Sequence, residues 1–344
     1  MAQLVKQPLL LFIFFVFCLQ SCKIKNHDTA SEISSEEKYA NTIDEDNLKK
    51  HLYVYASDEF EGRETGEPGQ KKAVQYLKKV YQELNIPSAW GNEEYFQFIP
   101  TSFFDYKFKD SENVLAFIRG SEKPEEVLVI SAHLDHEGID ENGNVFNGAD
   151  DDGSGTVAIL EIAKAFKLAQ EQGHGPKRSI LFLHVTGEEK GLLGSRYYVE
   201  NPVFPLSNTI ANLNIDMIGR IDETHKDNPN YLYLIGSDKL SQDLHDISEE
   251  ANEKFTQIDL DYTFNDDNDP NRFYYRSDHY NFAKNNIPVI FYFNGTHEDY
   301  HRISDTPDKI NYELLALRTK LIFHTAWSLV NRENRPYLIQ PFND

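Results

Sequence analysis

The sequence predicts an α/β fold in which a mostly parallel central sheet is covered by helices on both faces. Short apolar segments of strand length alternate along the chain with longer segments whose apolar residues recur at helical spacing. This alternation is typical of parallel sheets whose crossover helices bury both faces. The length of 344 residues and the hydrophobic content of 40% suffice for one large domain of this kind.

The expected elements begin near residue 47. Leu48, Leu52 and Tyr55 share one helical face, and the turn-rich segment Glu61–Gly69 separates this helix from a second one at about Gln70–Leu84. Further along we expect strands at Asn113–Ile118, Glu126–Ala132, Ser179–Val185, Ile210–Ile215 and Ile287–Phe293, a long helix from Gly153 to about Glu171, and a last helix at about Tyr312–Val330.

Residues 1–22 have the features of a signal peptide. Lys6 precedes an apolar run, Leu9–Leu19, that is about half as long as a membrane span requires. The run ends in Leu-Gln-Ser-Cys, which resembles the bacterial lipobox, so we expect Cys22 to be lipidated. The alternative is a simple signal peptide with a chance cysteine. Since Cys18 lies in the removed part, the mature chain would have no disulfide.

Residues 23–46 are polar and rich in Ser, Glu, Lys and Asn. We expect them to form a flexible tether between the lipid and a single domain at residues 47–344. The predicted location is the bacterial cell envelope, where the lipid anchor attaches the protein to a membrane. The 34 Lys and Arg residues against 56 Asp and Glu give a net charge of −22, with no long basic segment. Nucleic-acid binding is therefore not expected.

Side chains able to bind a metal follow several of the predicted strands. His133 and Asp216 each come directly after one of them, and the pair Glu188-Glu189 follows another after Thr186-Gly187. In an open parallel sheet, functional sites gather at the carboxyl ends of the strands. The sequence therefore predicts one site to which all these strands contribute.

The acidic segment Asn147–Gly155, with the sequence NGADDDGSG, precedes the long helix. Three adjacent carboxylates repel one another, but a cation among them and the positive end of a helix dipole would make them favourable. The alternative is an acidic surface turn that only caps the helix.

The candidate side chains suit a centre with two zinc ions. Imidazole and carboxylate groups are zinc ligands, and two imidazoles cannot saturate two ions without a bridging carboxylate, which the acidic segment offers. Two such ions hydrolyse amides when a further carboxylate carries the proton, and Glu188 and Glu189 could divide these roles. The candidate set comprises His133, Asp135, Asp151, Glu188, Glu189, Asp216 and His301.

Five segments resemble, in the same order, the dizinc aminopeptidase family of zinc exopeptidases, of metallopeptidase clan MH. They are HLDH at His133–His136, GADDDGSG at Gly148–Gly155, TGEEKGLLGS at Thr186–Ser195, NIDMIG at Asn214–Gly219 and YHRISDT at Tyr300–Thr306. The family includes aminopeptidase Y-like and bacterial leucyl aminopeptidase-like enzymes. The resemblance covers about residues 47–330 and implies a zinc exopeptidase fold of the phosphorylase/hydrolase-like type.

The resemblance also implies the role of each residue. It implies two zinc ions per chain, with His133 and Asp216 on one, Glu189 and His301 on the other, and Asp151 bridging them. It further implies Glu188 as the general base, Asp135 as the carboxylate that orients His133, and Tyr300 as a residue that helps to stabilise the oxyanion. A carboxylate in the role of Asp135 is physically expected beside a histidine that binds a metal.

The function that we expect is an aminopeptidase, which would release residues from the N-termini of peptides or proteins. The alternatives are a carboxypeptidase or dipeptidase, a glutaminyl cyclase, and a non-catalytic binding protein on the same fold. A carboxypeptidase would need a cationic side chain to receive the substrate carboxylate. We expect Arg302 to point away from the metals, and Arg220 and Arg276 to form structural ion pairs.

Other polar and aromatic residues near the motifs have simpler interpretations. We expect His136, Asp150 and Asp152 to form hydrogen bonds or caps, and the Asp278-His279 pair to cap a helix. The run of Asp266, Asp267 and Asp269 lacks calcium-loop spacing and reads as a solvated loop. Phe273, Tyr274 and Tyr275 belong to the core or to a pocket wall.

Overall fold

The computed structural model describes residues 1–4 and 34–339, and residues 34–339 belong to one compact unit. Most of the predicted signal peptide, Cys22 and the tether up to residue 33 lie outside the described residues. Among the described residues, no helix combines the length and the apolar composition needed to cross a membrane.

An eight-stranded mixed sheet forms the centre of the folded unit, with the strand order β1-β2-β4-β3-β5-β8-β6-β7. The four central strands β4, β3, β5 and β8 run parallel, whereas β1, β2 and β6 add antiparallel pairs. The strands are β1 (Phe96–Ile99), β2 (Ser111–Ile118), β3 (Lys123–His133), β4 (Arg178–Val185), β5 (Thr209–Ile215), β6 (Tyr231–Ile235), β7 (Asp259–Asp261) and β8 (Val289–Phe293). The predicted α/β fold with a mostly parallel sheet is confirmed.

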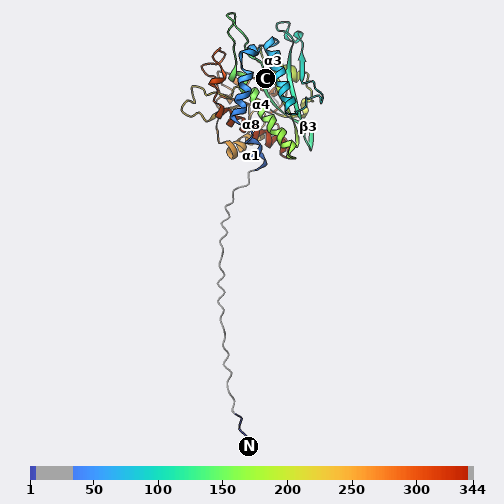
Figure 1. Cartoon of the computed structure of the whole chain (residues 1–344), viewed down its shortest axis with the longest axis vertical. Coiled ribbons are helices and arrows are strands. Elements are labelled where there is room, and N and C mark those ends of the chain that lie inside the picture. Colours follow the sequence, from blue (N-terminus) through green and yellow to red (C-terminus); the bar gives the residue numbers. More distant parts are fainter. Residues whose placement is uncertain (5–33, 340–344) are drawn as a thin grey trace. The chain divides into compact units, whose positions relative to one another are not determined.

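Helices cover both faces of this sheet (Figure 1). They are α1 (Ser35–Ala40), α2 (Glu45–Tyr55), α3 (Pro68–Glu83), α4 (Gly155–Glu171), α5 (Leu193–Glu200), α6 (Gln242–Ala251), α7 (His279–Ala283) and α8 (Tyr312–Asn331). Residues of α1, α2, α3, α4, α6 and α8 share one buried cluster with Ile130 of β3, while α5 and α7 pack on the other face with Val129. Neighbouring strand residues point to opposite faces, so each face has its own core.

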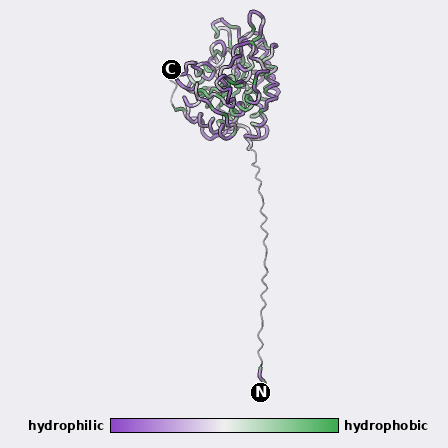
Figure 2. The backbone as a smooth tube through the Cα atoms, turned by 90° about the vertical axis from the view of Figure 1, so that its left-hand side faces the viewer, coloured by the Kyte–Doolittle hydropathy of each residue, from purple (hydrophilic) through white to green (hydrophobic). Residues whose placement is uncertain are grey.

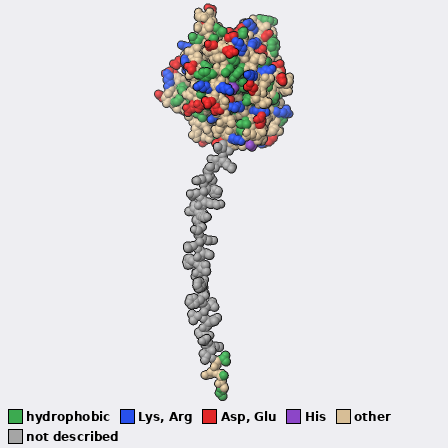
Figure 3. Space-filling model, viewed as in Figure 1, with side chains coloured by type: hydrophobic (Ala, Val, Ile, Leu, Met, Phe, Trp, Pro, Cys, Tyr) green, Lys and Arg blue, Asp and Glu red, His purple; other side chains and the backbone are tan. Residues whose placement is uncertain are grey.

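The polarity of the surface and the interior follows from this layering. The apolar segments lie in the interior of the folded unit (Figure 2). On the face drawn in Figure 3, acidic and basic side chains are interspersed. This face therefore lacks the basic stripe that a nucleic-acid-binding surface would need.

The predicted start of the domain at residue 47 is too late, because the folded unit begins at Ser34. Helix α1 opens with a capping box, in which the Ser34 side chain accepts a hydrogen bond from the Glu37 amide and Glu37 reaches back. Tyr39 is fully buried and stacks on Trp327 of α8. Part of the predicted tether thus belongs to the core.

Candidate metal centre

The parallel strands deliver the predicted side chains to one edge of the sheet. His133 is the last residue of β3, Asp216 directly follows β5, and Glu188 and Glu189 follow β4 after a short turn. His301 lies in the loop after β8, and Asp151 in the irregular turn before α4. The convergence expected from the strand ends is therefore observed.

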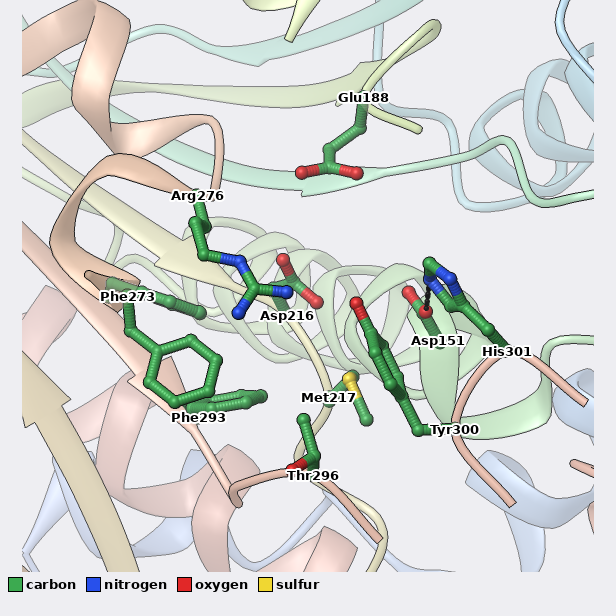
Figure 4. A pocket seen from close by; sticks show the side chains of 11 residues that line it. Asp151, Glu188, Asp216, Met217, Phe273, Arg276, Phe293, Thr296, Tyr300 and His301 are labelled. Atoms are coloured by element: carbon green, nitrogen blue, oxygen red, sulfur yellow. Dashed lines mark ion pairs between the residues drawn. The ribbon is translucent and has the colours of Figure 1, made fainter. Parts of the chain in front are cut away.

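Asp151 lies between two groups of side chains. His133 Nε2 is 3.1 Å from Asp151 Oδ1 and 3.5 Å from Asp216 Oδ1. On the other side, His301 Nε2 is 3.0 Å from Asp151 Oδ2 and 3.2 Å from Glu189 Oε2 (Figure 4). Each oxygen of one carboxylate thus faces a different imidazole, as a bridging ligand requires.

The side chains fit bound metal ions. Three groups of side chains could each hold a metal ion, because within each group the ligand atoms lie within 4.8 Å of one another. The groups are His133-Asp151-Asp216, His136-Asp151-Glu189 and Glu137-Glu189-His301. Asp151 Oδ2 and Glu189 Oε1 are buried without a hydrogen-bond partner. Buried polar atoms normally have partners, and a cation would satisfy these two. A donor set of imidazole nitrogen and carboxylate oxygen suits zinc.

The ionisable groups of the site are strongly coupled. Burial lowers the pKa of His301, but the neighbouring carboxylates of Asp151 and Glu189 outweigh it and raise the pKa to about 10. Burial raises the pKa of Glu188 well above that of an ordinary carboxyl, and the nearby charge of His133 opposes the rise. The imidazole must lose its proton to bind a metal, so metal binding competes with protons here.

The carboxylates that flank Asp151 hold the backbone, as the sequence predicts. The Asp152 carboxylate accepts hydrogen bonds from the amides of His133, Gly155 and Met217 at 2.9–3.1 Å. Asp150 accepts a bond from the Gly219 amide at 2.7 Å. The acidic turn is therefore tied to the ends of β3 and β5, which provide two of the candidate ligands.

Arg63 supports this turn, and no pattern in the sequence indicates its role. Its buried guanidinium donates hydrogen bonds to the carbonyl oxygens of Tyr55, Leu134, Asn147 and Gly148 at 2.6–3.2 Å. Leu134 follows His133, and Gly148 opens the acidic turn. One side chain thus fixes the backbone on both sides of the centre.

A second supporting cluster comes from the loop after β8. The Asp305 carboxylate accepts hydrogen bonds from the amides of Asp150 and Asp151, and His297 Nε2 lies 3.1 Å from Asp150 Oδ2. Arg220 pairs with Asp299 at 2.9 Å, so its predicted structural ion pair is confirmed.

Asp135 supports the centre in a way that differs from the expectation. The Nδ1 atom of His133 lies 3.1 Å from the backbone carbonyl oxygen of Asp135, whereas the carboxylate is 3.9 Å away. The carboxylate instead accepts hydrogen bonds from the Thr65 hydroxyl and from the Glu188 amide. It therefore positions Glu188 more directly than it orients His133.

His136 lies closer to the centre than expected. Its Nδ1 is 2.8 Å from Glu189 Oε1 and 3.9 Å from Asp151 Oδ2. The ring is fully buried, and neither nitrogen makes a hydrogen bond of good geometry. His136 therefore faces the carboxylates of Asp151 and Glu189. It is not one of the five residues for which the sequence predicts a ligand role.

A pocket of about 340 Å³ opens beside Asp151, Glu188 and Asp216 (Figure 4). Tyr300 lines it and stacks on His301, with ring centroids 4.0 Å apart. The other walls include Met217, Phe273, Phe291, Phe293 and Thr296. Of the three consecutive aromatic residues in the sequence, Phe273 thus forms pocket wall, Tyr274 is buried in the core and Tyr275 is exposed.

Arg276 also lines this pocket, which contradicts the predicted structural ion pair. Arg302 is not among the lining residues, in agreement with the expectation.

Asp278 occupies the position before α7, but its side chain makes no capping hydrogen bond. Asp266 and Asp267 lie in an exposed loop, as predicted, but Asp269 is buried, and its carboxylate accepts hydrogen bonds from the amides of Asn271 and Phe273.

The family model described as Peptidase family M28 matches residues 113–326, which is more than half of the chain. The chain therefore belongs to peptidase family M28. This result agrees with the zinc exopeptidase family that the sequence motifs resemble.

The chain matches only a part of the length of its curated relatives. The probable glutamate carboxypeptidase VP8 of Zea mays is 34% identical over 113 residues, which are 33% of this chain and 15% of the relative. The chain thus spans a small part of that protein.

Two solved structures show the same fold. The LapA aminopeptidase of Legionella pneumophila superposes with a TM-score of 0.67 at 23% identity, over 95% of this chain and 81% of that one. The Bacteroides thetaiotaomicron glutaminyl cyclase bound to N-acetylhistamine gives 0.65 at 18% identity, over 85% and 99%. Since an aminopeptidase and a cyclase fit almost equally well, the fold alone does not decide between these activities.

Proposed function

We propose that the protein is a zinc-dependent exopeptidase, and specifically an aminopeptidase with two zinc ions in a co-catalytic centre. The observation that carries this proposal is the position of Asp151, whose two oxygens face His133 and His301 respectively. His133 and Asp216 would hold one ion, Glu189 and His301 the other. Membership of family M28 supports a peptidase.

Each residue of the site has a part in the proposed reaction. When bound, the ions would polarise the scissile carbonyl and acidify the attacking water. Glu188 belongs to none of the three ligand groups, lines the pocket and has a raised pKa, so it suits the general base that takes the water's proton and passes it to the leaving amine. Tyr300 lies on the opposite wall, where its hydroxyl could donate to the developing oxyanion.

Blocked peptides test the direction of attack. Glu188 lines the pocket and is not one of the proposed ligands, so a free α-amine could pair with its carboxylate, which an N-acetyl group cannot do. N-acetylation of a short peptide such as Leu-Gly-Gly should abolish its cleavage, while C-terminal amidation should leave release of the first residue largely intact. Chromatography of the products measures both. Cleavage of the acetylated peptide with loss of its last residue would establish a carboxypeptidase.

Zinc content tests the bridging role of Asp151. We expect two zinc ions per chain in the wild-type protein, and less than one in Asp151→Asn, because this residue is shared by both groups. Elemental analysis after removal of free metal measures the content. Asp140→Asn, in an exposed loop, is the matched control and should keep both ions. One tightly bound ion and cyclisation of N-terminal glutamine would support the cyclase instead.

We also propose that the protein is attached to the bacterial cell envelope by a lipid on Cys22, on the basis of the N-terminal sequence alone. Cys22→Ser should move the protein from the membrane fraction to the soluble fraction while its specific activity stays unchanged. Fractionation and mass spectrometry of the N-terminus check this. A variant that stays in the membrane fraction would remove the lipobox interpretation.

A further inference from the structure

Arg276 is the only Lys or Arg among the residues that line the pocket in the described part of the chain. Figure 4 shows its guanidinium directed into the pocket, beside Phe273 and Phe293 and across from His301. The guanidinium carbon lies 4.8 Å from the centroid of the Phe273 ring. Stacking of this kind fixes the plane of a guanidinium and leaves its N–H groups free to donate.

Two other arginines near the site are already paired. Arg63 donates to four backbone carbonyls, and Arg220 pairs with Asp299. For Arg276, by contrast, the described residues provide neither an ion pair within 4.0 Å nor a hydrogen bond to the side chain. A stacked guanidinium with unused donors is suited to an external anion, and a carboxylate matches its fork with two hydrogen bonds.

Three carboxylates, those of Asp151, Glu188 and Asp216, also line the pocket, and bound zinc would neutralise Asp151 and Asp216. Glu188 then remains as a carboxylate that is not bound to zinc, and it enters the pocket from the segment after β4, whereas Arg276 enters from the segment before α7. A substrate with both an amine and a carboxylate would be oriented by this separation, the amine toward Glu188 and the carboxylate toward Arg276. The apolar walls of Phe273 and Phe293 suit a single short apolar stem between the two charges.

We propose that Arg276 receives a carboxylate of the substrate and thereby makes the enzyme selective for substrates with a carboxylate near the scissile bond. This inference rests on the proposed peptidase function. The carboxylate can come from the side chain of an N-terminal Asp or Glu, or from the C-terminus of a dipeptide. Both sources present the same group to the same guanidinium.

Four substrates distinguish these sources. Leucyl-4-nitroanilide and Leu-Gly amide have no carboxylate, glutamyl-4-nitroanilide has one in its side chain, and Leu-Gly has one at its C-terminus. Arg276→Gln should lower kcat/KM by about 10–100-fold for the substrate whose carboxylate Arg276 receives, either glutamyl-4-nitroanilide or Leu-Gly. The effect should arise mainly through KM, because charge-assisted hydrogen bonds are lost. Leucyl-4-nitroanilide should change by less than about 3-fold, and Arg276→Lys should restore part of the selectivity.

Arg272→Gln is the matched control. Arg272 is also exposed and stacks on an aromatic ring, with its guanidinium carbon 4.7 Å from the Tyr275 centroid, but it does not line the pocket. This variant should behave as wild type toward all four substrates. If Arg276→Gln lowers the rates for all four equally, while zinc content and stability are unchanged, Arg276 does not select carboxylates and the inference is overturned.

Thermal-shift measurements separate this inference from the proposed function. L-glutamate should stabilise the zinc-loaded wild-type protein more than L-glutamine does, and the difference should vanish in Arg276→Gln. If no peptide is hydrolysed but this difference is present, the peptidase proposal fails and the carboxylate site stands. If peptides are cleaved, but Arg276→Gln changes neither kcat/KM for the carboxylate substrates nor the stabilisation by L-glutamate, only the inference fails.

Discussion

Glu188→Gln is expected to reduce turnover by about 10²–10⁴-fold while the protein keeps its fold and its bound zinc. The amide is nearly the same size as the carboxylate but cannot accept a proton from water. The link from Glu188 to Asp135 uses the Glu188 backbone amide, so the substitution leaves it intact. Measurement of kcat with leucyl-4-nitroanilide, together with zinc content on the same preparation, checks this.

Glu189→Gln is the informative comparison, because Glu189 is the next residue in the chain and also carries a carboxylate. Its carboxylate lies 2.8 Å from His136 and 3.2 Å from His301, among the groups that could hold a metal. We therefore expect Glu189→Gln to lose zinc along with activity. If Glu188→Gln loses zinc and Glu189→Gln keeps it, the two roles must be exchanged.

The sequence predicted the central sheet and the convergence of the site because both depend on local patterns. Continuous apolar strands indicated a parallel sheet, and parallel strands bring His133, Glu188 and Asp216 to a common edge. One of the three groups, His133-Asp151-Asp216, consists only of residues that the motifs implied, whereas the other two also contain His136 and Glu137. The function of the implied residues as ligands and base stays a prediction.

The supporting side chains could not be predicted, because their partners are distant in the chain and are mostly backbone atoms. Arg63 bonds to carbonyls 71 to 85 residues away, as well as to Tyr55, and Asp305 to amides 154 and 155 residues away. Nothing in a turn-rich segment distinguishes such residues from exposed ones. Arg276 was misassigned for a related reason, since only the packing against Phe273 directs its side chain into the pocket.

Helix α1 shows how composition misled the domain boundary. Its surroundings are polar, and only Tyr39, Ala40 and Ile43 are fully or almost fully buried there. A single helical turn with so few apolar residues produces no periodicity. It is ordered by tertiary contacts with α4 and α8, which sequence patterns do not report.

Arg63→Met is expected to lower the free energy of unfolding by about 3–5 kcal/mol, because the carbonyls of Leu134, Asn147 and Gly148 lose their donor while buried. These carbonyls flank His133 and the acidic turn, so zinc affinity should fall as well. Urea unfolding of the zinc-free protein measures the first effect, and competition with a chelator the second.

Arg178→Met separates stability from site geometry. Arg178 is equally buried and donates to the carbonyls of Leu329, Arg332 and Glu333, but it begins β4 at the end away from the site. This variant should lose comparable stability and yet bind zinc as the wild type does. Normal zinc affinity in Arg63→Met, combined with the same loss of stability, would mean that Arg63 supports the fold and not the geometry of the metal centre.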